Sequence, residues 1–272
     1  MKIGLTLPSF IDNPTTAIEM AVAAEAAGLD GVFVYDHLFR RSSSGERRPA
    51  LEGVALLGAV AAATNRIAVG SLVMRSWLRP AASLATALAT VNRIASGRVR
   101  AGIGAGDSES KEENESFGLG FGSFDDRLQR LKESVQAARA ANVSVWVGGT
   151  SERVIEIASV YADGWNCWGL DLNSFSTQAA RLRTESAYSP FEISWGGLAV
   201  LAGNDSAATE KAHRFNISSS SSTDVLVGSP AVIVESLNQY RDAGADWVVV
   251  GPIDSSNLEN TEYLGEVRQL LN

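Results

Sequence analysis

The stretch "LATALATVNRIASGRVRAGIGAGD" (residues 84–107) contains one unit of the pattern that decides the fold. A helix is predicted over residues 80–97, because Pro80 suits the first turn of a helix and Gly97 suits its end. The apolar run over residues 98–106 predicts a strand. One helix and one strand therefore follow each other directly.

The same alternation runs through nearly the whole chain. Strands are also predicted over residues 2–8, 30–37, 66–74, 143–149, 164–168, 191–202 and 245–252, with helical patterns between them. They are apolar runs rather than strict alternations, as expected for parallel strands that are buried on both faces. Eight such units predict an α/β fold, a single (β/α)8 TIM barrel over residues 1–272, with a doubly wound sheet as the alternative.

Two polar segments interrupt this pattern. "RRSSSGERRP" (40–49) and "NISSSSSTDVLVGS" (216–229) are expected to be mobile insertion loops at the C-terminal face of the barrel. Each is either a solvated insertion or a lid over the barrel mouth, since long loops without secondary structure are often functional.

The composition limits the classes of function. The chain has 272 residues, is 45% hydrophobic and carries a formal net charge of −8. That charge argues against nucleic-acid binding, which usually needs a basic surface. The apolar stretch over residues 52–64 is too short to span a bilayer, and Cys167 is the one cysteine, so no internal disulfide forms. We therefore expect a soluble, cytoplasmic protein whose partner is a small molecule.

Two glycine-containing turns are candidates for binding a nucleotide-like ligand. Gly102, Gly104 and Gly106 follow a predicted strand, but an acidic loop comes next instead of a helix, which argues against a dinucleotide-binding turn. In "VGGTSE" (147–152) a strand runs into Gly148, Gly149 and Thr150, and a helix begins at once. Free N–H groups at a helix start bind phosphate, so this second turn is the better anion site.

Catalytic residues of such a barrel lie at the C-terminal ends of its strands. The strand ends carry no cluster of His, Cys and acidic residues with metal-ligand spacing, and no lysine. We therefore expect no metal, and the missing lysine argues against an imine-forming aldolase. His37, which follows Asp36 at a strand end, is the histidine placed for catalysis, whereas His213 lies in a polar helix.

Five stretches together resemble the luciferase-like oxidoreductase superfamily, and within it the branch that uses the deazaflavin coenzyme F420. They are "AAEAAGLDGVFVYDHLF" (23–39), "ATNRIAVGSLVM" (63–74), residues 84–107, "VWVGGTSERVIEIASVYADGWN" (145–166) and "VGSPAVIVESLNQYRDAGADWVVVGP" (227–252). The resemblance implies a barrel with the cofactor in its mouth and hydride transfer between a substrate and C5 of the deazaflavin. FMN-using relatives instead activate oxygen.

The resemblance also implies roles for individual residues. His37 and Asp107 are implied as acid/base groups, although Asp107 stands where relatives often have Glu. Contacts with the cofactor are implied for the following residues: Asp36, Ser71, Leu72, Met74, Ala105, Ser110, Gly148, Gly149 and Thr150. Ser71 and Leu72 match a bulge that carries a non-proline cis peptide bond in F420 relatives. The glycines of residues 102–106 would let the strand end pass close beneath the ring.

Three alternatives to an F420-dependent oxidoreductase stay open. They are an FMN-dependent monooxygenase on the same barrel, a cofactor-binding barrel without turnover, and a phosphate-binding isomerase or aldolase. Tryptophans near strand ends favour a hydrophobic or aromatic substrate, and basic residues for a sugar phosphate are not evident. The alanine-rich helices over 15–28, 51–65 and 80–97 suit either the interior packing of one barrel or the interface of a homodimer.

Overall fold

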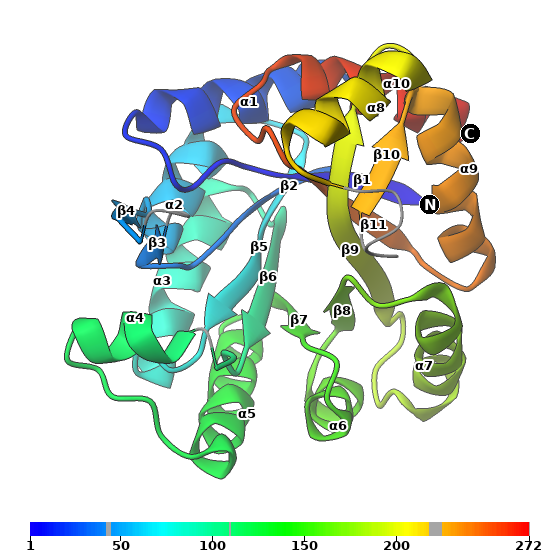
Figure 1. Ribbon diagram of the computed structural model, residues 1–272. Coiled ribbons are helices and arrows are strands. Elements are labelled where there is room, and N and C mark those ends of the chain that lie inside the picture. The colour runs from blue at the N-terminus through cyan, green and yellow to red at the C-terminus, as the bar shows by residue number, and fades with distance from the viewer. Residues whose placement is uncertain (42–44, 109, 218–224, 272) are drawn as a thin grey trace.

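The computed structural model describes residues 1–41, 45–108, 110–217 and 225–271, and shows a closed barrel of parallel strands with helices outside it (Figure 1). The strands of the ring are, in chain order, β1 (Lys2–Thr6), β2 (Gly31–Val34), β5 (Ala68–Arg75), β6 (Val99–Gly104), β7 (Ser144–Gly148), β8 (Gly164–Trp168), β9 (Glu192–Leu201) and β11 (Trp247–Pro252). β11 pairs with β1, where Val248 lies opposite Ile3, and this pairing closes the ring. The predicted (β/α)8 barrel is confirmed, and the doubly wound alternative is wrong.

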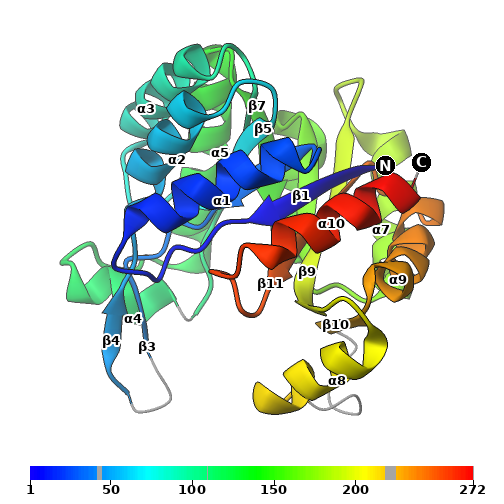
Figure 2. The same ribbon diagram turned by 90° about the horizontal axis from the view of Figure 1, so that it is seen from above.

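Helices lie outside the ring in both views of the molecule (Figures 1 and 2). The helices that connect successive strands are α1 (Pro14–Ala26), α2 (Gly53–Ala63), α3 (Ala81–Ile94), α5 (Phe124–Ala140), α6 (Glu152–Tyr161), α7 (Leu172–Glu185), α8 (Asp205–Arg214) and α9 (Pro230–Asp242), and α10 (Glu259–Leu270) follows the last strand. The chain starts helix α5 with a reciprocal capping box between Ser123 and Asp126. Within the described residues, every helix is too short or too polar to cross a membrane.

Aromatic side chains fill the inside of the barrel. Phe33, Trp146 and Trp247 are buried there, and the rings of Trp146 and Trp247 lie 5.5 Å apart. Glycine at position 70 makes room for them, since a Cβ there would lie 2.7 Å from the ring of Phe33. Large rings beside glycines thus fill the interior, in keeping with the packed core of this fold.

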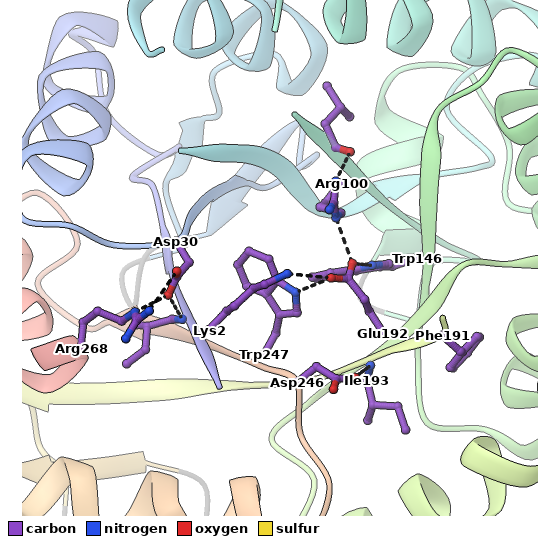
Figure 3. Close-up of polar contacts among 12 residues, drawn as sticks. Lys2, Asp30, Arg100, Trp146, Phe191, Glu192, Ile193, Asp246, Trp247 and Arg268 are labelled. Atoms are coloured by element: carbon purple, nitrogen blue, oxygen red, sulfur yellow. Dashed lines mark hydrogen bonds and ion pairs between the residues drawn. The ribbon is translucent and has the colours of Figure 1, made fainter. Parts of the chain in front are cut away.

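A half-buried carboxylate, that of Glu192, lies at the N-terminal end of the barrel (Figure 3). Glu192 accepts hydrogen bonds from the indoles of Trp146 (3.2 Å) and Trp247 (3.0 Å) and pairs with Lys2 (3.1 Å) and Arg100 (2.9 Å). Burial acts to raise the pKa of Glu192, but these hydrogen bonds and positive charges outweigh it and lower the pKa below its ordinary value. These contacts of Glu192 stabilise the fold at the end of the barrel opposite to the strand ends where the catalytic residues are expected.

Both segments that were predicted to be loops contain strands. Residues 40–49 contribute to an antiparallel hairpin of β3 (Phe39–Arg41) and β4 (Arg47–Pro49), and β10 (Val225–Gly228) pairs with β9. The hairpin lies beside a short helix that was not predicted, α4 (Ser110–Ser116), as Figures 1 and 2 show. Arg41 and Arg47 form ion pairs with Glu112 on α4, and these ion pairs hold the hairpin against the helix. The polar sequence of the segment does not indicate such long-range pairing. Residues 42–44 and 218–224 of the two segments lie outside the described residues.

Candidate active site

A cavity of about 700 Å³ opens at the C-terminal ends of the barrel strands. This volume falls in the usual range for small-molecule and cofactor sites. Its walls come from the ends of β2, β5, β6, β7, β8 and β9 and from the segments that follow them. The lining residues are Tyr35, Asp36, His37, Leu72, Val73, Arg75, Gly104, Ala105, Gly106, Asp107, Ser110, Phe124, Arg127, Gly148, Gly149, Thr150, Ser151, Val154, Asn166, Trp168 and Leu198.

Strand β5 bulges where it reaches this cavity. Its register against β6 shifts between Ser71 and Met74, and the peptide bond between Leu72 and Val73 is cis, within the segment for which the resemblance implied one. The bulge turns Leu72 and Val73 toward the cavity. Ser71 donates to the carbonyl of Gly102 at 2.9 Å and Met74 is fully buried, so neither lines the cavity as the resemblance implied. Both side chains pack the barrel wall instead.

The glycines of strand β6 serve this bulge. A Cβ at Gly104 would lie 2.5 Å from Val73 Cγ2, and one at Gly148 on β7 would lie 2.4 Å from Val73 Cγ1. A Cβ at Gly102 would lie 2.2 Å from the carbonyl oxygen of Ser71. These glycines therefore make room for the neighbouring strand, and Gly104 and Gly106 also line the cavity; that they make room for a bound ring stays a prediction.

His37 lies at the cavity in contact with a buried carboxylate. Its Nδ1 is 2.8 Å from Glu113 Oε1, while Glu113 Oε2 accepts from the backbone N–H of Leu38 at 2.6 Å and from Arg75 at 3.0 Å. Burial acts to raise the pKa of Glu113, but the hydrogen bonds from His37 and Leu38 and the charges of His37 and Arg75 outweigh it and lower the pKa. Sequence reasoning missed Glu113, which stands in the acid-rich run "SESKEENES" (108–116) that is typical of a solvated surface.

Asp36 borders the cavity, but its carboxylate is bound elsewhere. The side chain is 1% exposed, pairs with both terminal nitrogens of Arg79 (2.8 and 2.9 Å) and accepts from the backbone N–H of Arg75 at 2.9 Å. The Arg75 side chain in turn donates to the backbone carbonyl of Asp36 at 2.8 Å. These bonds hold the ends of β2 and β5 together, so the Asp36 carboxylate stabilises the wall of the cavity.

The segment after β6 places Asp107 at the mouth of the cavity. Asp107 is exposed, and its Oδ1 accepts from the backbone N–H and the hydroxyl of Ser110, each at 2.9 Å. This pairing occupies the Ser110 hydroxyl and fixes the start of helix α4. Ala105 is buried and lines the cavity wall. Asp107 is thus a capping residue whose carboxylate also borders the cavity.

The predicted anion site lies on the same cavity. Gly148, Gly149 and Thr150 line it, and Ser151, the N-cap of α6, makes no side-chain capping bond within the described residues. The backbone N–H of Gly149 donates to Asn166 O at 3.1 Å, so the free donors are the N–H groups of the first turn of α6. Arg127 on α5 also borders the cavity and adds a positive charge that sequence reasoning did not identify.

An aromatic and aliphatic wall forms another part of the cavity. Trp168 and Leu198 line the cavity, and 36% and 37% of their surface is exposed. The Trp168 indole lies over Gly196, where a Cβ would come within 2.5 Å of the ring, and its ring centroid is 6.3 Å from that of Tyr35. Burial raises the pKa of Tyr35 to about 12, so its phenol stays protonated at neutral pH. No group of three metal-ligating side chains occurs among the described residues.

The sequence model of the luciferase-like monooxygenase family matches residues 1–143, more than half of the chain. The chain belongs to this family. The resemblance to this family that the sequence showed is confirmed. The barrel and the cavity at its strand ends agree with it.

Individual relatives of this luciferase-like chain use different cofactors. An F420-dependent glucose-6-phosphate dehydrogenase of Amycolatopsis mediterranei (strain U-32) is 34% identical over 140 residues, which cover 51% of this chain and 41% of that protein. The chain thus spans less than half the length of that relative. An F420-dependent secondary alcohol dehydrogenase in complex with an F420-acetone adduct has a TM-score of 0.81 at 17% identity, covering 100% of this chain and 99% of that one. A riboflavin lyase with modified FMN has a TM-score of 0.76 at 13% identity, covering 100% and 91%.

Proposed function

We propose that the protein is an F420-dependent oxidoreductase that transfers a hydride between C5 of the deazaflavin and a small organic substrate. The observation that carries this proposal is that one cavity brings together His37, with its Glu113 partner, and the uncapped start of helix α6. Its family and the F420-dependent relatives support the choice of cofactor.

The residues present fit a phosphate-bearing cofactor. Gly149 has a φ of 142°, and a Cβ there would lie 2.9 Å from Val154, so only glycine leaves the backbone open at this turn. Ser151 and the first N–H groups of α6 would hold a phosphate at the positive end of the helix dipole, and Arg127 adds a positive charge to the lining of the same cavity. Leu72, Val73 and Ala105 would form the apolar surface against a ring.

Two side chains of this chain would move protons. F420, when bound, supplies a ring carbon that accepts or donates a hydride. His37 would take the proton from a substrate hydroxyl as that hydride leaves, or return it in the reverse direction, because its ring is 39% exposed at the cavity. Asp107, at the mouth, would exchange a proton with the ring or with water.

The substrate that this wall favours is uncharged and hydrophobic or aromatic. Trp168, Leu198 and Tyr35 offer apolar surface. The two arginines that line the cavity are Arg75, which is paired with Glu113, and Arg127, which donates to the carbonyl of Gly122 at 3.2 Å. A sugar phosphate would need a further free cation at the reacting end. We therefore propose an uncharged substrate for this chain, in contrast to the glucose 6-phosphate named for the relative.

Substitution of the two proton-transferring residues tests this proposal. His37→Ala and Asp107→Ala should each lower F420-dependent turnover by about 10²- to 10⁴-fold. His213→Ala, which removes the exposed histidine of α8, is the matched control and should leave turnover unchanged. Full activity in both the His37 and the Asp107 variants would overturn the assignment.

An FMN-dependent monooxygenase on the same barrel is the second candidate. It is favoured by the likeness to a riboflavin lyase with modified FMN. We further propose that residues 1–272 act as one domain in the cytoplasm. A homodimer, a lid role for the two polar segments and the direction of the reaction stay predictions.

A further inference from the structure

We propose that Glu113 is a positioning residue that fixes the tautomer of His37, so that the Nε2 lone pair is presented to the substrate. The inference deepens the proposed function, because it matters for turnover only if His37 transfers a proton. Its structural part, the state of the imidazole ring, holds whether or not F420 binds.

The contacts of the carboxylate determine which imidazole nitrogen carries the proton. Glu113 Oε1 lies 2.8 Å from His37 Nδ1, and an ionised carboxylate can only accept hydrogen bonds. Nδ1 must therefore be the donor, and in the neutral ring Nε2 is left without a proton. The lowered pKa of Glu113 agrees with an ionised carboxylate at neutral pH. The pair therefore defines one tautomer.

Glu113 is itself held in place by two further donors. The backbone N–H of Leu38 (2.6 Å) and Nη2 of Arg75 (3.0 Å) both bind Oε2, and the side chains of Glu113 and Arg75 are 8% and 5% exposed. Arg75 also donates to the carbonyl of Asp36, the residue before His37. One carboxylate thus ties helix α4 and the ends of β2 and β5 to the histidine, which leaves the ring little rotational freedom.

The ring keeps an accessible edge despite these bonds. The His37 side chain is 39% exposed, and the rings of Phe10 and Tyr35 flank it at centroid distances of 5.5 and 6.3 Å. Within the described residues, Nε2, the nitrogen on the opposite side of the ring from Glu113, accepts no hydrogen bond. Nε2 is therefore the nitrogen that remains for a substrate hydroxyl or carbonyl.

Nitrogen-15 NMR of the histidine rings tests the proposal on the apo protein. The chain has two histidines, so His213→Gln assigns both sets of signals. At a pH well above the ordinary titration range of imidazole, wild-type His37 should show a protonated Nδ1 and an unprotonated Nε2. A His37 ring in the wild type that is predominantly protonated on Nε2 would overturn the proposal.

Variants at Glu113 connect the tautomer to catalysis. Glu113→Met removes the acceptor and should populate the other tautomer and lower kcat by about 10- to 100-fold with a small change in KM. Glu113→Gln, whose amide oxygen can still accept from Nδ1, should retain more of both the tautomer and the activity. Glu115→Gln on the exposed face of α4 is the matched control and should change neither.

The outcomes separate this inference from the proposed function. A wild type without F420-dependent turnover but with a protonated Nδ1 would reject the function and keep the positioning role. Turnover that persists in Glu113→Met while its tautomer changes would reject the catalytic importance of Glu113. If Glu113→Met does not fold, the wild-type tautomer and the Glu113→Gln variant still decide.

Discussion

Gly148 offers a quantitative test of how strands β5 and β7 pack beneath the cavity. A Cβ at this position would lie 2.4 Å from Val73 Cγ1, against 3.4–4 Å for an ordinary contact. Gly148→Ala therefore forces a shift of about 1 Å in one of the two strands, and overpacking of this kind costs about 1–3 kcal/mol. For a domain of this size, that loss lowers Tm by roughly 2–12 °C.

A second substitution should relieve the same clash. Val73→Ala removes both Cγ atoms, after which the nearest atom of residue 73 to the new methyl group is Cβ, at 3.6 Å. The free energy of unfolding of the double variant Gly148→Ala with Val73→Ala should then exceed the value expected from adding the two single effects by about 1–2 kcal/mol. Urea unfolding followed by circular dichroism measures all four corners of this cycle.

Gly58 provides the matched control for this cycle. It lies inside helix α2, and a Cβ there would meet its nearest neighbour, Val91, at 3.9 Å. Gly58→Ala should leave stability unchanged or raise it by about 0.5–1 kcal/mol, because alanine is favoured over glycine in a helix. A Gly148→Ala variant as stable as the wild type, or purely additive effects of the two substitutions, would refute this description of the packing.

Three further predictions concern the two ends of the barrel. Glu192→Gln should lower the free energy of unfolding by about 1–3 kcal/mol at neutral pH. Because the pKa of Glu192 is lowered from 4.5 in the folded protein, this difference from wild type should shrink as the pH falls below 4.5, as measured by urea unfolding. A difference that grows in acid would contradict the role of the carboxylate. Trp168→Ala should raise KM for a hydrophobic substrate about tenfold while Trp168→Phe keeps most of the affinity, in steady-state kinetics; equal KM values would remove Trp168 from the substrate wall. Arg127→Gln should weaken F420 binding about tenfold and reduce its salt dependence in a fluorescence titration, and an unchanged Kd would exclude Arg127 from the phosphate site.

The regular part of the fold could be predicted because each barrel strand is decided locally. The run over residues 98–106, for example, is apolar apart from Arg98 and Arg100, and β6 occupies Val99–Gly104 within it. The hairpin of β3 and β4 could not be predicted, because apart from the buried Phe39 its strand residues are exposed and mostly arginines. It depends on ion pairs with Glu112, which is more than sixty residues away in sequence.

Part of the site could be predicted, because the barrel pattern brings strand ends to one face: His37 ends one predicted strand and Asp107 directly follows another, and both line the cavity. Gly149 and Thr150 stand out because a glycine turn before a helix has a local physical meaning. Glu113 has no such mark: its chemistry comes from burial against His37 and Arg75, and burial is a property of the folded chain. Val73 lines the cavity where Met74 was expected, because the register of β5 against β6 shifts between Ser71 and Met74. The pattern of apolar residues in the sequence does not indicate this shift.

The most direct test of the proposed function is a binding titration of the apo protein with F420 and, separately, with FMN. The absorbance and fluorescence of each cofactor differ and report its binding. We expect saturable F420 binding that is weakened by Arg127→Gln, with FMN bound more weakly. Tight FMN binding without F420 binding would contradict the proposed function and make the protein an FMN-dependent member of its family.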